Sequence, residues 1–303
     1  MNTPSRRDFL QQSAVLLAAA MVGQSFSVDK KKALLAFSTL GCPGWTFPQT
    51  IEFAAKHGYK GIELRGILKQ LDLPLCPEFN SSDNRAATLR MMKDKGLKFA
   101  NLGSSATLHF AEGAERQKNL DDAKRFIDLA HDIECQNIRV FPNNFIKGQE
   151  KQVTIDLIIK GLVYLAEYSK GSGVNILMES HGDLVRIDDL EYVMKTAAHP
   201  QVGLIWDISN MWTITKESPT AAYGRLKHYI KHTHIKDAKL IGDKLEYTFL
   251  GTGDVPIFEA VDLLVKDGFK GYYSFEWEKL WHPEIAEPEL AFADYPKAIK
   301  KHL

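Results

Sequence analysis

The chain has 303 residues, of which 45% are hydrophobic and 25% are charged, as in an ordinary globular protein. These fractions exclude disordered, collagen-like and polytopic membrane classes. The 38 basic and 38 acidic side chains balance, so no basic excess points to nucleic acid or to an acidic membrane surface. The three cysteines form neither a disulfide framework nor a CxxC motif, and we expect them to be small core residues.

The first predicted element is an export signal at residues 1–28. The run SRRDFL at 5–10 resembles a twin-arginine signal, and an uncharged apolar run follows at 14–23. This run is too short for a comfortable membrane span, so we expect no stable transmembrane segment. Its small residues resemble a cleavage region, which predicts a periplasmic or otherwise exported protein. The alternative is an amphipathic start of a cytosolic protein.

Residues 29–303 are expected to form one domain, because no linker or low-complexity run divides them. Short apolar, β-branched runs alternate with longer amphipathic stretches. The predicted strands are 34–40, 61–64, 99–102, 138–141, 176–179, 202–207, 230–235 and 272–275. The predicted helices are 48–56, 85–95, 116–133, 153–169, 187–197, 220–226, 257–266 and 290–302, with a hairpin at 239–250.

Strict alternation of strands and helices implies parallel strands joined by helical crossovers. Eight such units in about 275 residues predict an α/β fold, a single closed (β/α)8 TIM barrel, rather than an open sheet. The weakest unit is the second, because residues 66–84 show no clear pattern. No GxGxxG motif follows a strand, so a dinucleotide-binding fold has no support.

Ionisable side chains end four consecutive predicted strands: Glu179, Asp207, His234 and Glu276. Strand ends of a TIM barrel share one rim, so these side chains can converge. Each alone is more simply a helix N-cap or an ion-pair partner, but together they suit one divalent cation, Mn²⁺, Mg²⁺, Co²⁺ or Zn²⁺. Arg139, within the fourth strand, is expected to pair with a rim carboxylate such as Glu63, because a lone buried charge is costly.

At these residues the chain resembles the xylose isomerase-like TIM barrel superfamily, the sugar phosphate isomerase/epimerase group. The motifs are FSTLG (37–41), GIELR (61–65), MESHG (178–182), WD (206–207), HTHIKD (232–237), LGTGDV (250–255) and SFEWE (274–278). The resemblance implies one divalent metal ion held by Glu179, Asp207, His234 and Glu276. It also implies that Glu179 and Glu276 transfer a proton next to a substrate carbonyl, through an enediolate.

The chain departs from this superfamily at two places. Asn210 stands where many members have a histidine three residues after the strand-six aspartate, and asparagine is a poor base and a weak ligand. The apurinic endonucleases of the superfamily need further histidines at early strand ends, where this chain has Arg65 and Ser104. Together with the balanced charge, this argues against DNA repair and nucleic-acid binding.

Five further residues follow predicted strands and are expected to bind substrate: Trp45, His181, Asn210, Lys236 and His282. His181 lies two residues after Glu179. Lys236 lies two residues after His234 and shares its strand face. Aromatic rings such as Trp45 pack against the C–H faces of sugars, and His282 is expected to close the pocket. The simpler alternatives are a packed tryptophan and solvent-facing histidines.

The leading interpretation is a metal-dependent isomerase or epimerase that removes a proton next to the carbonyl of a small sugar or polyol. In the first alternative, the same site eliminates a neighbouring oxygen substituent, as a lyase or dehydratase on keto-sugars of the 3-keto-glycoside or inosose type. Export and Asn210 favour this alternative, because free sugar phosphates are cytoplasmic metabolites. The second alternative is a non-catalytic carbohydrate-binding barrel. The oligomeric state and the choice of metal stay open.

Overall fold

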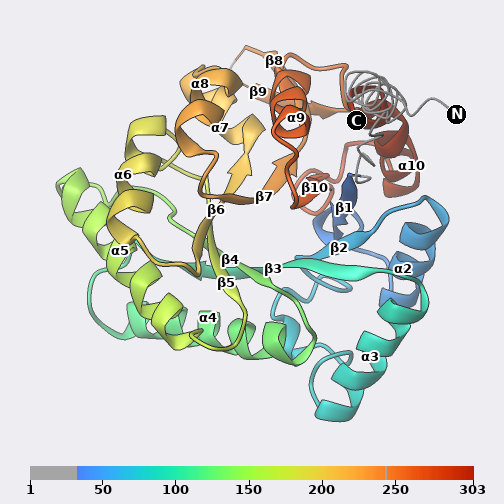
Figure 1. Ribbon diagram of the computed structural model, residues 1–303, viewed down its shortest axis with the longest axis horizontal. Helices are drawn as coiled ribbons and strands as arrows, with labels where there is room; N and C mark the ends of the chain where they lie inside the picture. The colour runs from blue at the N-terminus through green and yellow to red at the C-terminus, as the bar shows by residue number, and fades with distance from the viewer. Residues whose placement is uncertain (1–32, 243) are drawn as a thin grey trace, which may run out of the picture. The chain divides into compact units, whose positions relative to one another are not determined.

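The computed structural model describes residues 33–242 and 244–303 (Figure 1). The predicted export signal at residues 1–28 lies outside them. Eight strands close into a barrel in the order β1, β10, β7, β6, β5, β4, β3, β2. Each strand pairs in parallel with both neighbours. The prediction of a single (β/α)8 barrel is confirmed.

The barrel strands are β1 (Leu34–Ser38), β2 (Gly61–Leu64), β3 (Lys98–Thr107), β4 (Asn137–Phe141), β5 (Asn175–Glu179), β6 (Val202–Asp207), β7 (Ile230–Ile235) and β10 (Tyr272–Phe275). The helices are α2 (Phe47–Lys56), α3 (Ser82–Asp94), α4 (Ala114–Asp132), α5 (Lys151–Tyr168), α6 (Ile187–Ala197), α7 (Ile208–Thr215), α8 (Pro219–Leu226), α9 (Ile257–Lys266) and α10 (Pro288–Ile299). β8 (Asp237–Ile241) and β9 (Lys244–Thr248) form an antiparallel hairpin after β7. The helices surround the strands (Figure 1).

Local capping explains where the elements differ from the predictions. β1 ends at Ser38, because the chain turns into a 3-10 helix at Thr39–Gly41. α3 begins earlier than predicted, where the Ser81 hydroxyl accepts a hydrogen bond from the Asn84 N–H. The helix α7 was not predicted, since its short sequence is rich in β-branched and aromatic residues of weak helix propensity.

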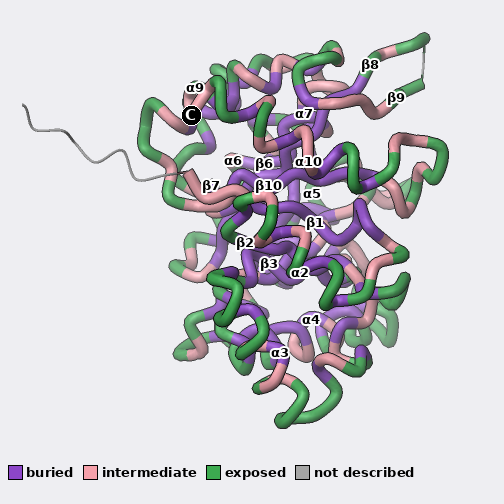
Figure 2. Tube along the Cα trace, turned by 90° about the vertical axis from the view of Figure 1, so that its right-hand side faces the viewer, coloured by how far each residue is buried: buried purple, intermediate pink, exposed green. Residues whose placement is uncertain are grey.

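The core lies in two layers, inside the barrel and between the strands and the helices. Alternation along β4 sends Ile138 and Val140 outward to the helices and Arg139 into the barrel. Buried residues accordingly run along the strands, while exposed residues lie on the outer sides of the helices (Figure 2). The three cysteines are free and buried, as expected.

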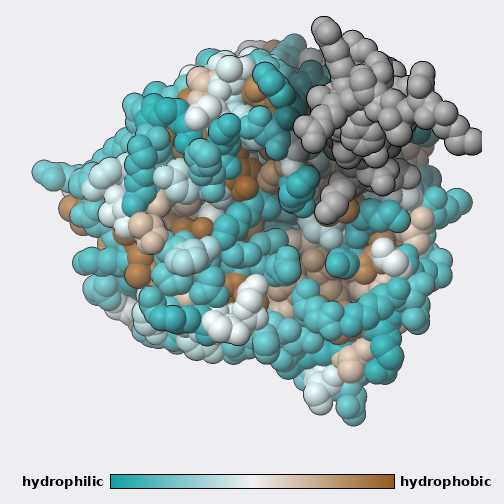
Figure 3. Space-filling view, viewed as in Figure 1, coloured by the Kyte–Doolittle hydropathy of each residue, from teal (hydrophilic) through white to brown (hydrophobic). Residues whose placement is uncertain are grey.

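The outer surface is mixed in character. On the face seen in Figure 3, hydrophilic side chains predominate and hydrophobic ones are scattered. Within the described residues, no helix has the length and apolar character needed to span a bilayer. The β8–β9 hairpin projects from the barrel with an exposed tip (Figure 2).

A buried carboxylate anchors the base of this hairpin. The Asp237 carboxylate accepts hydrogen bonds from the backbone N–H groups of Gly251 (2.8 Å), Gly253 (2.9 Å), Ala238 (2.9 Å) and Val255 (3.3 Å). A Cβ atom on Gly253 would lie 2.2 Å from Asp237 Oδ1, so this position requires glycine. The LGTGDV motif is therefore a structural turn.

Candidate metal centre

The carboxyl ends of four adjacent strands, β5, β6, β7 and β10, bring the four predicted metal ligands together. One ligand atom from each of Glu179, Asp207, His234 and Glu276 lies within 4.8 Å of the others. His234 Nδ1 is 3.3 Å from Glu276 Oε1, 3.6 Å from Glu179 Oε1 and 3.7 Å from Asp207 Oδ2. All four side chains are buried.

The orientation of the His234 ring suits binding of a metal cation through Nδ1. Nε2 is 3.0 Å from Glu63 Oε1, and a carboxylate can only accept, so the neutral ring carries its proton on Nε2. Nδ1 then presents a lone pair to three carboxylates, and this buried atom has no hydrogen-bond partner among the described residues. One nitrogen and three carboxylate ligands suit a divalent Mn, Mg, Co or Zn ion.

The electrostatics of His234 support the same conclusion. Burial lowers its pKa, but Glu276, Glu63 and Glu179 outweigh burial and raise it well above the usual value. A proton and a metal ion therefore compete for Nδ1, and metal binding at neutral pH would release a proton.

Two positively charged side chains, Arg139 and Lys236, bind the two glutamates through their outer oxygens, the Oε2 atoms. Glu179 Oε2 accepts a hydrogen bond from Arg139 Nη1 at 3.0 Å, and Glu276 Oε2 accepts one from Lys236 Nζ at 2.6 Å. Burial raises the pKa of Glu179, but His234 and Arg139 bring it below the usual value. Burial also raises the pKa of Glu276, but His234 and Lys236 outweigh burial and bring this pKa well below its usual value. Both glutamates are thus ionised and can serve as bases or ligands.

Lys236, a predicted substrate-binding residue, lies among carboxylates. Its Nζ is 2.8 Å from Asp207 Oδ2, 2.6 Å from Glu276 Oε2 and 2.7 Å from Glu278 Oε1. Sequence reasoning did not select Glu278, although it stands two residues after Glu276 in the SFEWE motif. Burial raises the pKa of Glu278 despite the adjacent ammonium group.

Arg139 pairs with a rim carboxylate, as predicted, but this carboxylate is not the expected Glu63. Arg139 pairs with Glu179 at 3.0 Å rather than with Glu63, because β4 is hydrogen-bonded to β5 while β2 lies beyond β3. Glu63 instead reaches across the barrel to β7, where its Oε2 is 2.6 Å from His232 Nε2. Its role beside His234 was missed, and the available signal was an acidic residue inside the four-residue apolar strand GIEL.

Two of the remaining predicted substrate-binding residues lie close to this cluster. The Asn210 N–H donates to Asp207 Oδ1 at 2.8 Å, so Asp207 also caps α7. The His181 ring is 4.6 Å from the Phe141 ring, over which the Arg139 guanidinium lies at 4.0 Å. His181 Nδ1 is buried and has no hydrogen-bond partner in the described part of the chain.

The other two predicted substrate-binding residues have contacts of their own, outside the four-ligand cluster. Trp45 packs against Phe53 of α2 and Phe292 of α10, with ring centroids 5.0 and 5.8 Å apart. His282 lies 5.0 Å from the Tyr247 ring and pairs with Glu284 at 3.1 Å. These contacts give Trp45 a packing role and place His282 on the hairpin side of the rim.

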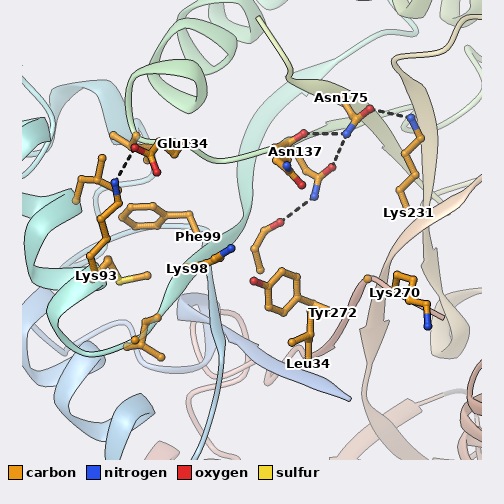
Figure 4. Close-up of a pocket in the computed structure, with 18 of the residues that line it drawn as sticks. Leu34, Lys93, Lys98, Phe99, Glu134, Asn137, Asn175, Lys231, Lys270 and Tyr272 are labelled. Atoms are coloured by element: carbon orange, nitrogen blue, oxygen red, sulfur yellow. Dashed lines mark hydrogen bonds and ion pairs between the residues drawn. The ribbon is translucent and has the colours of Figure 1, made fainter. Parts of the chain in front are cut away.

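A cavity of about 810 Å³ opens at the opposite, amino-terminal end of the barrel (Figure 4). Its lining includes the strand starts Leu34, Lys98, Asn137 and Asn175. Polar groups there pair with one another, as in the Lys231–Asn175 bond of 2.8 Å. TIM-barrel chemistry belongs to the carboxyl end of the strands, so the buried cluster, not this cavity, is the candidate functional site.

Comparison with known proteins agrees with this fold. A family model described as xylose isomerase-like TIM barrel matches residues 51–301. The chain belongs to the xylose isomerase-like TIM barrel family. The resemblance in the sequence motifs is thereby confirmed. No curated protein sequence matches the chain.

Three solved structures of this fold illustrate the range of similar proteins. The IOLI protein with a binding zinc atom has a TM-score of 0.74 at 16% identity, covering 89% of this chain and 98% of its own. D-psicose 3-epimerase with D-tagatose from Clostridium cellulolyticum H10 has a TM-score of 0.70 at 16% identity, with coverages of 89% and 98%. The probable 3-DHS dehydratase AsbF from Bacillus anthracis has a TM-score of 0.72 at 16% identity, with coverages of 88% and 98%. At these identities the likeness shows the shared fold.

Proposed function

We propose that this protein is a divalent-metal-dependent enzyme that moves a proton next to the carbonyl of a sugar or polyol, as an isomerase or epimerase. The observation that carries the proposal is the buried His234 Nδ1, which has no hydrogen-bond partner within residues 33–242 and 244–303 and faces three carboxylates at the carboxyl end of the barrel. The epimerase and the zinc-containing protein among the structural neighbours support the same chemistry.

In this proposal, Glu179, Asp207, His234 and Glu276 would hold the cation, which would supply polarisation of the substrate carbonyl. Glu179 and Glu276 come from β5 and β10, with β6 and β7 between them. One ionised glutamate takes the proton from the carbon next to the carbonyl, and the other returns a proton. Arg139 and Lys236 hold the outer oxygens of these glutamates and so orient the inner ones.

Elimination is the second candidate reaction. After proton removal, the C–O bond on the neighbouring carbon breaks, and the departing oxygen takes a proton to leave as water or an alcohol. Lys236 and Glu278 favour this candidate, because they place an ammonium group and a further carboxyl group beside Glu276, where the departing oxygen needs a proton donor. A dehydratase is among the structural neighbours, and an unsaturated product that absorbs in the ultraviolet would identify elimination.

Solvent deuterium exchange tests the proposed proton transfer. Metal-loaded protein in D₂O should introduce deuterium next to the carbonyl of a ketose, an inosose or a 3-keto-glycoside. Glu179→Gln and Glu276→Gln should each slow exchange by about 10²–10⁴-fold. Glu191→Gln, which removes a surface carboxylate paired with Arg225, is the matched control. Exchange retained in both cluster variants would contradict the mechanism, and tight sugar binding without exchange would favour a carbohydrate-binding barrel.

We also propose that residues 1–28 are an export signal and that residues 29–303 form the mature periplasmic domain. The SRRDFL motif supports this proposal. Replacing both Arg6 and Arg7 with lysine should abolish periplasmic accumulation, as judged by cell fractionation. N-terminal sequencing of the exported native protein should locate the cleavage site. Undiminished export of the double variant would contradict a twin-arginine signal.

A further inference from the structure

A firmly braced loop after β10 keeps a tryptophan exposed. The backbone N–H groups of Trp281 and His282 donate to the Glu278 carbonyl at 3.0 and 2.8 Å. Trp277 Nε1 donates to the Ala286 carbonyl at 2.9 Å, and Lys279 Nζ donates to the Pro283 carbonyl at 2.7 Å. Trp281 is nevertheless 54% exposed, whereas Trp277 is 1% exposed. The Trp281 ring thus lies outside the core, on a loop that these hydrogen bonds hold.

Contacts of the Tyr247 and His282 rings connect the candidate metal centre to this loop. Lys236, which contacts Asp207 and Glu276, has its Nζ 6.0 Å from the centroid of the Tyr247 ring on β9. The Tyr247 ring in turn meets the His282 ring edge-on, with centroids 5.0 Å apart. Trp281 immediately precedes His282 in the chain, on the same loop.

We propose that Tyr247, His282 and Trp281 form a subsite for the second ring, sugar or aglycone, of a glycoside. This inference rests on the proposed function, because the reacting ring would lie at the candidate metal centre. Aromatic faces pack well against sugar C–H groups and aglycone rings. The substrate class is thus a keto-sugar that carries a second ring, rather than a free monosaccharide.

Paired ligands of one and two rings test the subsite. The probes are D-fructose with lactulose, and 3-ketoglucose with phenyl 3-ketoglucoside, titrated calorimetrically into metal-loaded protein. The native protein should bind the two-ring member of at least one pair about tenfold more tightly. Trp281→Ala should bring that ratio close to one, while Trp281→Phe should retain most of it. Tyr192→Ala, which removes an exposed aromatic ring on α6, is the control and should keep the native ratio.

The outcomes separate the subsite from the proposed chemistry. A native protein without two-ring preference in either pair, including one that binds no probe, would overturn the subsite. So would a preference that survives Trp281→Ala in a variant with the native melting temperature. Deuterium exchange without a preference for two-ring ligands would contradict the subsite and leave the proposed proton transfer intact. Two-ring preference that depends on Trp281, without exchange into any probe, would retain the subsite and contradict the proposed proton transfer.

Discussion

Glu63 determines how His234 faces the candidate metal centre. Its Oε1 lies 3.0 Å from His234 Nε2, and its Oε2 is engaged by His232 at 2.6 Å and by the Ser274 hydroxyl at 3.1 Å. With both oxygens engaged, the carboxylate cannot turn away from the ring. Carboxylates of this kind fix the tautomer of a metal-binding histidine and increase its basicity.

Glu63→Gln should therefore weaken divalent metal binding by about 10–100-fold, because the neutral amide no longer polarises the imidazole. Competition with a fluorescent zinc chelator measures the affinity without reference to catalysis. Ser274→Ala is the matched control, since it removes one hydrogen bond to Glu63 Oε2 and leaves the Glu63–His234 contact in place, and it should cost much less affinity. Equal affinities of Glu63→Gln and the native protein would show that the orientation of His234 has another cause.

At the scale of elements, the hairpin after β7 depends on one glycine. The carboxylate of Asp237 collects four backbone N–H groups, and Gly253 leaves room for it. The hairpin carries Tyr247, so its attachment at Asp237 also positions one wall of the proposed subsite. Strain at Gly253 would therefore reach the rim of the site.

Gly253→Ala should lower the free energy of unfolding by about 1–3 kcal/mol, because the new methyl group overlaps the Asp237 carboxylate. Urea unfolding followed by circular dichroism measures the change. Gly224→Ala provides the contrast, since Gly224 lies in α8 with open space around its Cα, and alanine should stabilise that helix by about 0.5–1 kcal/mol. A neutral Gly253→Ala would show that the loop relaxes around the extra atom.

At the scale of the whole molecule, most of the buried ionisable side chains among the described residues lie inside the barrel, toward the carboxyl ends of its strands. Burial opposes the charge of Glu63, but His234 and His232 hold the pKa of this carboxyl below its usual value. The pKa of Glu179 and that of Glu276 are also lowered, whereas the pKa of His234 is raised. The stability of the metal-free protein must therefore depend on pH in two opposite ways.

The metal-free protein should be most stable between about pH 4.3 and 6.5, the usual pKa values of Glu and His. Stability from the carboxylates is complete above their unfolded pKa and is lost as the pH falls through the lower folded values. Stability from His234 is complete below its unfolded pKa and is lost as the pH rises toward the higher folded value. Urea unfolding midpoints measured in the presence of a chelator should fall at both acid and alkaline pH. Metal loading should remove the fall at alkaline pH. A flat profile between pH 6.5 and 9 in chelator would contradict a protonated His234.

Local patterns in the sequence determined the eight strand–helix units and the four residues that end consecutive strands. Hydrophobic periodicity is a local property, and a closed barrel necessarily gathers the carboxyl ends of its strands at one rim. Only the tertiary structure decided which partners these residues take: Arg139 pairs with Glu179 on the adjacent strand, and Glu63 reaches His234 across the barrel. It also packed Trp45 between two helices and left Trp281 exposed. Such choices depend on strand order and on distances across the barrel interior, which no pattern of neighbouring residues encodes.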